Sequence, residues 1–425
     1  MSAEAGNART AELNTPVQNA IRDFLARERE AQTRFLAELV KVPSDNPPGD
    51  CRPHAERTAA LLAELGFKVE RHPVPDAAVK AAGMVSCINL IVRERFGVGG
   101  PIVALNAHGD VVPPGAGWSC DPYGAQIHDG RMFGRGVAVS KSDFATYAWA
   151  LMALKHSGAP LRGSVELHFT YDEETGGELG PAWLLGQALS RPDFAIGAGF
   201  AHGITVAHNG CLHLEVAVHG RSGHAARPET GVDALEAATA IMAGLYALRK
   251  SFAAKRSAMP GIAHPTLVIG LISGGINTNV VPDRVTFRID RRIVPEEDPA
   301  EAERALTAQL HELAAKWPSI RLQVTRVLLA KPFTRLPGQE KLVSAIRRHA
   351  ARILGGNIEA QGVPLYTDAR HYGEAGIPTV LYGAGPRTLE EANGHMADEN
   401  LKLDDLYKAT EVMALCLLDL LSGKA

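Results

Sequence analysis

Apolar residues recur at helical spacing in some stretches of the chain and form short continuous runs in others. Residues 16–42 carry apolar side chains at helical spacing, and Pro43 ends the predicted helix. Residues 53–65 predict a second helix that stops at Gly66, a residue type common just after a helix C-terminus. Short apolar runs predict strands at residues 67–71, 88–93 and 102–105. Strands that alternate with helices indicate an α/β sheet.

The middle of the chain has a different pattern. Residues 212–219 alternate apolar and polar side chains, which is typical of a strand with one buried face. The segments after it predict a helix at 232–250, strands at 266–272 and 284–291, a helix at 299–316 and a strand at 320–327. This β-α-β-β-α-β order predicts a ferredoxin-like insert over residues 211–328.

The α/β pattern resumes after the insert, with helices predicted at 339–354 and 403–421 around a strand at 379–382. We therefore predict the α/β fold class: a doubly wound mixed sheet domain interrupted by a smaller ferredoxin-like α+β domain. The larger domain would be built from residues 16–210 and 329–425. Residues 1–15 are polar and rich in Ala and Asn, which predicts a disordered tail.

The composition narrows the class of protein. A chain of 425 residues has room for two or three domains, and 46% hydrophobic with 21% charged residues is ordinary for a soluble protein. A formal net charge of −3 gives no electrostatic basis for binding nucleic acid or an anionic membrane. No apolar run approaches the length of about 20 residues that a membrane span needs. Five scattered cysteines predict reduced thiols in a cytoplasmic protein.

Candidate chemistry begins at the carboxyl end of the strand predicted at residues 102–105, where the chain places His108 and Asp110. Open α/β sheets carry their sites at that end of the strands. An imidazole there can bind a metal through one nitrogen while a nearby carboxylate holds the other ring N–H. The alternative is a turn that carries a polar histidine.

A second candidate follows the strand predicted at residues 165–171, which ends in Asp172-Glu-Glu174. Three consecutive carboxylates repel one another unless a cation offsets their charge. One of them would then be a metal ligand and its neighbour a general base. A solvated acidic turn is the alternative interpretation.

Further motifs follow in a definite order. They are Trp118…Asp121-Pro, Gly134-Arg-Gly136, Gly223-His-Ala, Asn279-Val-Val-Pro282, Asp290-Arg-Arg292, Thr367-Asp-Ala-Arg370 and His395. Together with His108-Gly-Asp and Asp172-Glu-Glu, this set resembles the dinuclear zinc amidohydrolases that include acetylornithine deacetylase, succinyl-diaminopimelate desuccinylase, aminoacylase and bacterial glutamate carboxypeptidase. The resemblance runs from about Val42 to the C-terminus. It implies a zinc-peptidase-like α/β domain interrupted by a dimerisation domain, and hence a homodimer.

The resemblance also implies residue roles. His108, Glu174 and His395 resemble metal ligands. Glu173 resembles the general base that activates water, and Asp110 resembles the residue that orients His108. His224, in the insert, resembles a residue that reaches a partner subunit's site and stabilises an oxyanion. Asn279 and Arg292 resemble a clamp on the substrate's carboxylate, a task that suits the planar guanidinium.

Two positions depart from the family's pattern. Val139 stands where the family has an Asp that bridges both metals, and we align Gly199 with a second acidic ligand. Two divalent ions close together need bridging anions, so we expect one Zn²⁺ per chain, with Co²⁺ or Mn²⁺ as alternatives. His108, Glu174 and His395 make a His₂Glu set of the mononuclear catalytic kind.

Two nearby side chains are candidates to replace the missing ligands. The segment after Val139 predicts a helix from about residue 144 to residue 156, and Ser140 and Asp143 before it have capping-box-like spacing. Asp143 lies one helical turn beyond Val139, but it is also suited to a helix N-terminus. His202 follows Gly199 by three residues, and its alternative is an ordinary loop histidine. We expect the remaining central histidines to serve structure or face solvent: His128, His168, His208, His213 and His219.

The leading hypothesis is a metal-dependent amidohydrolase that cleaves an amide next to a carboxylate, in an N-acyl amino acid or a small peptide. The second hypothesis is a catalytically silent homodimer that binds a carboxylate-bearing ligand, because two metal ligands are missing. Retention of Glu173, which a binding protein would not need, argues against it. A third is hydrolysis of a different bond, such as a lactam or ester, with Asp143 in a new role.

Overall fold

The computed structural model describes residues 15–423. The predicted disordered tail therefore lies outside the described residues, except for Thr15, which caps the first helix through its side chain. The described chain divides into two compact units. The first contains the residues up to Val206, Arg335–Ala360 and the residues from Thr367 onward, and the second contains Ala207–Thr334 and Gln361–Tyr366. The second unit is thus longer at both ends than the predicted insert.

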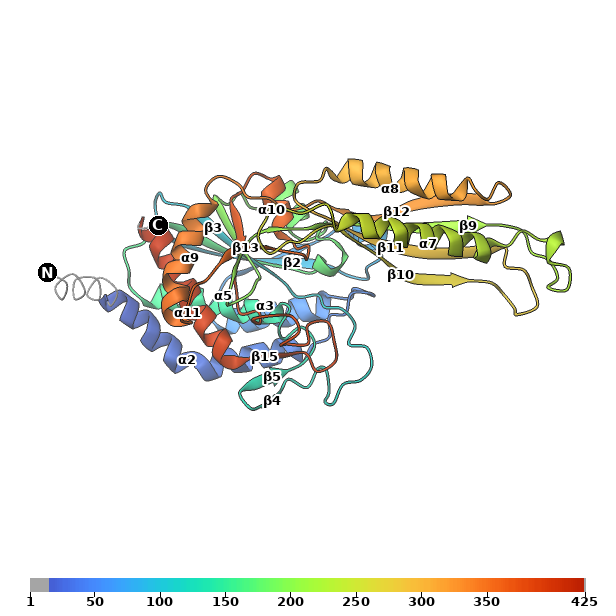
Figure 1. Cartoon of the computed structure of the whole chain (residues 1–425). Helices are drawn as coiled ribbons and strands as arrows, with labels where there is room; N and C mark the ends of the chain where they lie inside the picture. Colours follow the sequence, from blue (N-terminus) through green and yellow to red (C-terminus); the bar gives the residue numbers. More distant parts are fainter. Residues whose placement is uncertain (1–14, 424–425) are drawn as a thin grey trace. The chain divides into compact units, whose positions relative to one another are not determined.

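The first unit is built on an eight-stranded mixed sheet (Figure 1). The strand order is β1-β2-β6-β3-β7-β14-β8-β13. The bounds are β1 Val69–Pro73, β2 Ile88–Gly97, β3 Ile102–His108, β6 Gly163–Thr170, β7 Phe194–Gly197, β8 Ile204–His208, β13 Ala360–Val363 and β14 Thr379–Leu381. Strands β6, β3, β7 and β14 are parallel, so their carboxyl ends share one edge of the sheet.

Helices pack on both faces of this sheet. The bounds are α2 Pro16–Val40, α3 Arg52–Glu64, α4 Asp76–Ala81, α5 Lys141–His156, α6 Pro181–Gly186, α9 Gln339–Ile353, α10 Ala369–Glu374 and α11 Leu403–Ser422. On one face, Phe144 of α5 stacks on Phe169 of β6 at 3.9 Å between ring centroids. On the other, Tyr372 of α10 packs with Ala104 of β3 and Ala195 of β7. Alternate strand positions point to opposite faces, so this is a doubly wound sheet.

A small antiparallel sheet lies beside the main one, with β15 Asn400–Lys402, β5 Arg131–Phe133 and β4 Gln126–His128 in that order. Asp129 and Gly130 form the turn between β4 and β5, both with positive φ, as the Asp-Gly hairpin signal indicates. The pairing of β15 with β5 joins the C-terminal region to the segment that leads into α5.

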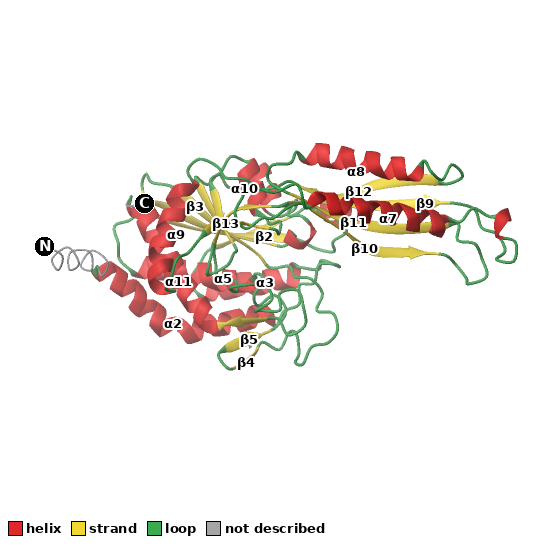
Figure 2. Cartoon of the chain, viewed as in Figure 1, coloured by secondary structure: helices red, strands yellow, loops and turns green. Residues whose placement is uncertain are grey.

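The second unit is a four-stranded antiparallel sheet in the order β10-β11-β9-β12. Its elements are β9 Gly210–His219, α7 Ala234–Phe252, β10 Thr266–Gly274, β11 Arg284–Ile293, α8 Pro299–Ala314 and β12 Arg321–Ala330. Helices α7 and α8 run beside the strands, and their apolar sides form one core with alternate residues of β9 and β11 (Figure 2). The element order and strand order are ferredoxin-like, and the predicted fold class is confirmed.

The start of α5 differs from the sequence prediction. The helix begins at Lys141, three residues before the predicted start, so Asp143 lies within its first turn. The predicted capping box of Ser140 and Asp143 is wrong, because the Ser140 side chain makes no capping hydrogen bond. Its hydroxyl instead bonds both the backbone N–H and C=O of His108, at 3.1 and 3.0 Å. Ser140 therefore fixes the end of β3.

Two further observations concern the chain as a whole. Within residues 15–423, no helix combines the length and apolarity that crossing a membrane requires. All five cysteines fall inside the described region, and none is joined in a disulfide.

Candidate active site

The last residue of β3 is His108, whose buried imidazole is held by Asp110. Nδ1 lies 3.0 Å from the backbone oxygen of Asp110 and 3.4 Å from its carboxylate Oδ1. An Nδ1–H that donates to this carbonyl leaves Nε2 with its lone pair free, as a metal ligand requires. We had predicted from the sequence that the Asp110 carboxylate orients His108, whereas in the structure the Asp110 backbone oxygen lies closer to Nδ1.

The carboxylate of Asp110 has another set of partners. Its oxygens accept hydrogen bonds from the backbone N–H groups of Glu173 and Glu174, at 3.2 and 3.1 Å, and from the Asn46 side-chain amide at 3.0 Å. Asp110 is fully buried. These three donors fix the position of the carboxylate, and the carboxylate in turn fixes the turn that carries the two glutamates.

Strand β6 is followed by a single 3₁₀ turn, Glu173–Thr175. One potential ligand atom from each of His108, Glu173 and Glu174 falls in a group whose members all lie within 4.8 Å of one another. His108 Nε2 is 3.8 Å from Glu173 Oε2. The two strand ends that the sequence singled out are therefore brought together.

His395 lies beside Glu174, on the loop between β14 and β15. Its Nε2 lies 3.4 Å from Glu174 Oε1, and its side chain is 50% exposed. The Glu174 carboxylate raises the pKa of His395 above its ordinary value. The residue adopts a φ of +62°, which is uncommon for a residue with a side chain and shows that the loop imposes this position.

The donor set fits a divalent cation. Glu174 Oε1 is buried and finds no hydrogen-bond partner among the described residues, which is a costly state for a carboxylate oxygen. Burial and the nearby carboxylates of Glu174 and Asp110 raise the pKa of Glu173 to about 8. Burial alone would lower the pKa of His108, but Glu173 and Asp110 raise it well above its usual value. A cation bound by His108 and Glu174 opposes these shifts, because it favours ionised carboxylates and a neutral imidazole.

The two departures from the family pattern are physically different. Val139 is half-buried, and its backbone N–H donates to Glu399 Oε1 at 3.2 Å, so the backbone is held in place at this position. The valine side chain has no atom that can bind a metal. Gly199 has no room for a side chain, because an added Cβ would lie 2.7 Å from the backbone nitrogen of Tyr382. An acidic ligand cannot stand at Gly199 without a backbone shift.

The two proposed replacements make other contacts. Asp143 is buried on α5 and accepts a hydrogen bond from the backbone N–H of Ala384 at 2.6 Å; burial raises its pKa to about 7. His202 Nε2 lies 3.0 Å from Asp405 Oδ1 on α11. Neither residue belongs to the group formed by His108, Glu173 and Glu174.

The remaining predicted site residues belong to the second unit. His224 and Asn279 are exposed on adjoining loops, where the Ala225 N–H donates to the Asn279 carbonyl at 3.0 Å. Arg292 lies near the far end of β11 and pairs with Cys211 of β9, whereas Arg284, at the end nearer Asn279, pairs with His219. Eight residues of extended strand span about 27 Å. Within one chain, Asn279 and Arg292 therefore lie near opposite ends of β11, and the predicted clamp on the substrate carboxylate stays a prediction.

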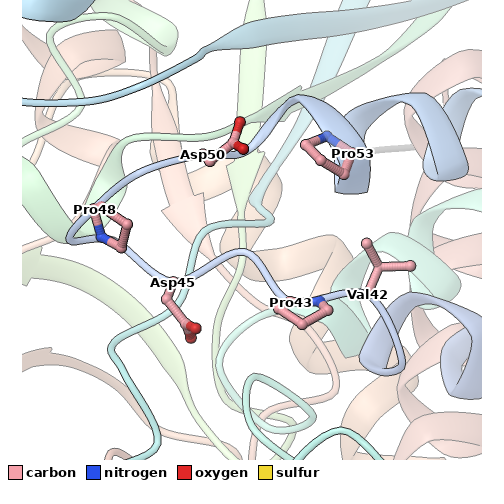
Figure 3. A pocket seen from close by; sticks show the side chains of 6 residues that line it. All are labelled: Val42, Pro43, Asp45, Pro48, Asp50 and Pro53. Atoms are coloured by element: carbon pink, nitrogen blue, oxygen red, sulfur yellow. The ribbon is translucent and has the colours of Figure 1, made fainter.

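A pocket of about 280 Å³ lies along the loop that precedes α3 (Figure 3). Its lining residues are Val42, Pro43, Asp45, Pro48, Asp50 and Pro53. The Asp45 carboxylate accepts the Tyr123 hydroxyl, and Asp50 accepts the Ser86 hydroxyl at 2.6 Å. The two carboxylates point in opposite directions in Figure 3, and both have protein partners, so the pocket is bounded mainly by proline rings.

Sequence reasoning missed the residues that support the site. Asn46 donates to Asp110 and, at 3.2 Å, to Thr175. Buried Glu399 pairs with Arg135 and accepts the N–H of Ala138 at 3.0 Å, which fixes the backbone around Val139. These contacts join segments more than 60 residues apart, so local sequence carried no signal for them.

Comparison with known sequences agrees with this geometry. The family model of peptidase family M20/M25/M40 matches residues 104–419. Acetylornithine deacetylase of Proteus mirabilis (strain HI4320) is 30% identical over 359 residues, which cover 84% of this chain and 86% of that protein. Succinyl-diaminopimelate desuccinylase of Gluconobacter oxydans (strain 621H) is 26% identical over 369 residues, which cover 83% of this chain and 88% of that protein.

Solved structures show the same fold. Human carnosine dipeptidase 1 superposes with a TM-score of 0.76 at 16% identity, over 96% of this chain and 99% of that chain. Bacillus subtilis YXEP, described as a dinuclear metal binding peptidase from the M20 family, superposes with a TM-score of 0.64 at 17% identity, over 93% and 99% of the two chains. The extent of the family match shows that the chain belongs to peptidase family M20/M25/M40 and is a hydrolase acting on C–N bonds.

Proposed function

We propose that the chain is a metal-dependent amidohydrolase that cleaves an amide bond next to a substrate carboxylate, in an N-acyl amino acid or a small peptide. The observation that carries the proposal is the convergence of His108, Glu173 and Glu174 at the ends of β3 and β6, with Glu174 Oε1 buried and without a hydrogen-bond partner among the described residues. A buried acidic cluster of this kind costs folding free energy and is retained where its chemistry is needed. The names of the two relatives, a deacetylase and a desuccinylase, agree with an acylated amino acid as substrate.

His108, Glu174 and His395 would hold the metal, and we favour Zn²⁺ because two imidazoles and one carboxylate suit it. When bound, a divalent ion supplies a Lewis acid that polarises the scissile carbonyl and lowers the pKa of water. We keep one ion per chain as the proposal, since neither Val139 nor Gly199 offers a donor atom.

Glu173 is the proposed general base. Its carboxylate lies beside His108 and is nearly buried, and its backbone N–H donates to the Asp110 carboxylate. It takes a proton from the attacking water and delivers it to the leaving amine, so one carboxylate serves both steps of the reaction.

In a homodimer, Asn279 of one chain and Arg292 of the other can contribute to the same site, although they lie far apart within one chain. We propose that Arg292 binds the substrate carboxylate of its own chain, while His224 and Asn279 reach the site of a partner subunit. The His224 Nδ1 accepts the Ala226 N–H at 3.0 Å, so Nε2 carries the proton and is free to donate to a developing oxyanion.

The test is an assay of the purified chain with added Zn²⁺, Co²⁺ or Mn²⁺ on N-acetylornithine, N-succinyl-diaminopimelate and a panel of dipeptides, with an ester and a lactam included. Release of amine from at least one amide substrate, dependent on metal and lost in Glu173→Gln, is the expected result. Metal-dependent turnover of only the ester or lactam would contradict the proposal.

A second candidate function rests on the missing donors at Val139 and Gly199: a catalytically silent dimer that binds a carboxylate-bearing ligand. It predicts ligand binding by calorimetry without turnover in any metal. Amide hydrolysis with stoichiometric metal would exclude it.

A further inference from the structure

A second group of potential ligands lies on the sheet of the second unit. Cys211 and His213 are two residues apart on β9, and Asp290 of β11 stands directly opposite His213 in the antiparallel register. The alternate residues of β9, Leu212 and Leu214, face the helices α7 and α8 in the core. Cys211, His213 and Asp290 therefore share the sheet face that these two helices do not cover.

One potential ligand atom from each of the three side chains lies within 4.8 Å of the other two. Cys211 Sγ is 3.1 Å from His213 Nε2. The Asp290 carboxylate contacts them through different oxygens, with Oδ2 at 3.2 Å from His213 Nε2 and Oδ1 at 3.7 Å from Cys211 Sγ. A tetrahedral zinc ion with bonds of about 2.0–2.3 Å separates its sulfur, nitrogen and oxygen ligands by roughly 3.3–3.6 Å. The observed edges scatter around that range, so small side-chain movements would close the site.

The arrangement is not that of a nucleophilic triad. A Cys–His–Asp triad needs one ring nitrogen on the thiol and the other on the carboxylate. Here Nε2 is the nitrogen in contact with both Cys211 and Asp290. Burial and the Asp290 charge also raise the pKa of Cys211 to about 12, so the free thiol is a poor nucleophile.

Arg292 supports the carboxylate from the other side. Its Nε and one terminal nitrogen lie 3.0 and 3.1 Å from the two oxygens of Asp290, and its guanidinium lies over the Tyr366 ring at 5.6 Å. A carboxylate has about four acceptor positions, so two remain for a ligand on the side of Cys211 and His213. Burial opposes ionisation of Asp290, but His213 and Arg292 hold its pKa below the ordinary value. A metal ligand braced by a second residue in this way is typical of protein metal sites.

We propose that Cys211, His213 and Asp290 bind a divalent ion of the zinc class, with an open fourth position for water or a small donor. The side chains of His213 and Asp290 are 32% and 30% exposed, so an ion reaches the site from solvent. The thiolate and imidazole favour Zn²⁺ over Mg²⁺, Ca²⁺ or Mn²⁺. Binding releases the thiol proton to solvent, and its affinity therefore rises with pH. This site shares no ligand with the proposed metal centre of His108, Glu174 and His395, although Arg292, which supports Asp290, is also the proposed contact of the substrate carboxylate.

The test uses Co²⁺ in place of Zn²⁺ on the full chain, because a cobalt–thiolate bond gives a near-ultraviolet charge-transfer band that nitrogen and oxygen ligands do not give. We expect the band in the wild-type chain and in Cys120→Ala, a matched control for a cysteine outside any ligand group. It should persist in His108→Ala and disappear in Cys211→Ser and in His213→Ala. Zinc-loaded protein should show a Zn–S distance of about 2.3 Å by X-ray absorption.

Three results would overturn the proposal: no thiolate band in folded wild-type protein, a band that survives in Cys211→Ser, or zinc-loaded protein without sulfur scattering. Serine preserves the volume of Cys211, which packs beside Ala330 of β12. If Cys211→Ser nevertheless fails to fold by circular dichroism, Asp290→Asn provides the second variant. It should lower cobalt affinity at least tenfold while retaining the packing.

Discussion

The backbone N–H of Glu174 donates to Asp110 Oδ2 at 3.1 Å, and the N–H of the preceding residue donates to Oδ1 at 3.2 Å. Asp110 follows β3 and Glu174 follows β6, two parallel neighbours in the sheet. The Asp110 carboxylate therefore fixes the turn that carries the proposed metal ligand Glu174 and the proposed general base Glu173, while the Asp110 backbone oxygen orients His108, the proposed ligand on its own strand. The site depends on this link between strand ends.

Asp110→Asn tests that link. An amide retains one acceptor oxygen but places an NH₂ group against a backbone N–H, so one of the two hydrogen bonds is lost. We expect metal affinity to fall about 10–100-fold, as for other residues that support metal ligands, with the chain still folded. Metal titration followed by circular dichroism measures both quantities. Unchanged affinity would show that Asp110 is not needed to position the turn.

Glu173→Gln separates metal binding from proton transfer. The amide is nearly isosteric but cannot accept a proton, so kcat should fall about 10²–10⁴-fold. Metal content should stay at the wild-type value, because Glu174 and not Glu173 is the proposed ligand. Glu174→Gln is the matched variant, and there the metal content itself should fall. A Glu173→Gln enzyme that retains full kcat would remove the proposed base.

Sequence patterns were sufficient to predict the fold and the proximity of His108 to Glu173 and Glu174. Apolar residues alternate strictly with polar residues along β9 and recur at helical spacing along α2, and these patterns identified the strand and the helix. Both patterns arise because one face of each element is buried. His108 and Glu173 could be placed together because the carboxyl ends of parallel strands share an edge. The type of each element could be predicted from its own segment alone. The proximity of His108 to Glu173 follows from a general rule of parallel sheets.

What the sequence missed depends on contacts between distant segments. His213 was expected to serve structure or face solvent, and the sequence did not indicate that β-sheet register places it opposite Asp290, 77 residues away. Ser140 was read as a helix cap, whereas its hydroxyl binds the end of β3. The sequence also gave no indication that the length of β11 separates Asn279 from Arg292 within one chain. Tertiary packing determines the register of the strands, the partner that each polar side chain bonds and the length of each strand.

The two altered ligand positions should respond differently to substitution. Val139→Asp puts a carboxylate on a half-buried side chain, and we expect the number of metal ions in the hydrolytic centre to rise from one to two. Elemental analysis of the variant and the wild type, both in a Cys211→Ser background, measures the change. Equal metal content in both would show that Val139 is not at a metal position.

Gly199→Ala should destabilise the chain. Its Cβ would lie 2.7 Å from the Tyr382 nitrogen, a backbone atom that cannot move aside, so we expect a loss of about 1–3 kcal/mol in the free energy of unfolding. Gly203→Ala is the control, because an added Cβ there meets nothing within 4 Å. Urea denaturation of the wild type, Gly199→Ala and Gly203→Ala measures the difference. Equal midpoints for the three proteins would contradict the predicted clash between a Cβ at position 199 and the Tyr382 nitrogen.

Glu166 should make stability depend on acid pH. Burial alone would raise its pKa, but hydrogen bonds from His168 and Ser190 and the charge of Arg93 lower it to about 2. Its contribution is complete above its unfolded pKa, near 4.5, and is lost as pH falls toward 2. We expect Glu166→Gln to cost about 2–3 kcal/mol near neutral pH and much less near pH 3.

Glu70→Gln is the control for this effect. Glu70 also pairs with Arg93, at 3.0 Å, but its side chain is 35% exposed, so it should contribute under about 1 kcal/mol. Urea unfolding at both pH values gives the two differences. A Glu166→Gln penalty that is the same at both pH values would rule out ionisation of Glu166 as its source.

The shared-site proposal can be tested by mixing two inactive variants. Glu173→Gln damages the proposed hydrolytic centre, and His224→Ala removes the proposed donor on the second unit. In a hybrid dimer, one site then carries both defects and the other carries neither. Random exchange of subunits should restore about a quarter of wild-type activity. Asn279→Ala in place of His224→Ala should give the same recovery, because the two residues lie on adjoining loops.

Mixing Glu173→Gln with Glu174→Gln is the matched control. Both defects belong to the same centre, so every site in the hybrid keeps one of them and no activity should return. Recovery in the first mixture but not in the second requires that His224 act on a partner's site, which accounts for Asn279 and Arg292 lying at opposite ends of β11. No recovery in either mixture, with hybrid dimers shown by mass spectrometry, would place His224 and Glu173 of one chain in the same site.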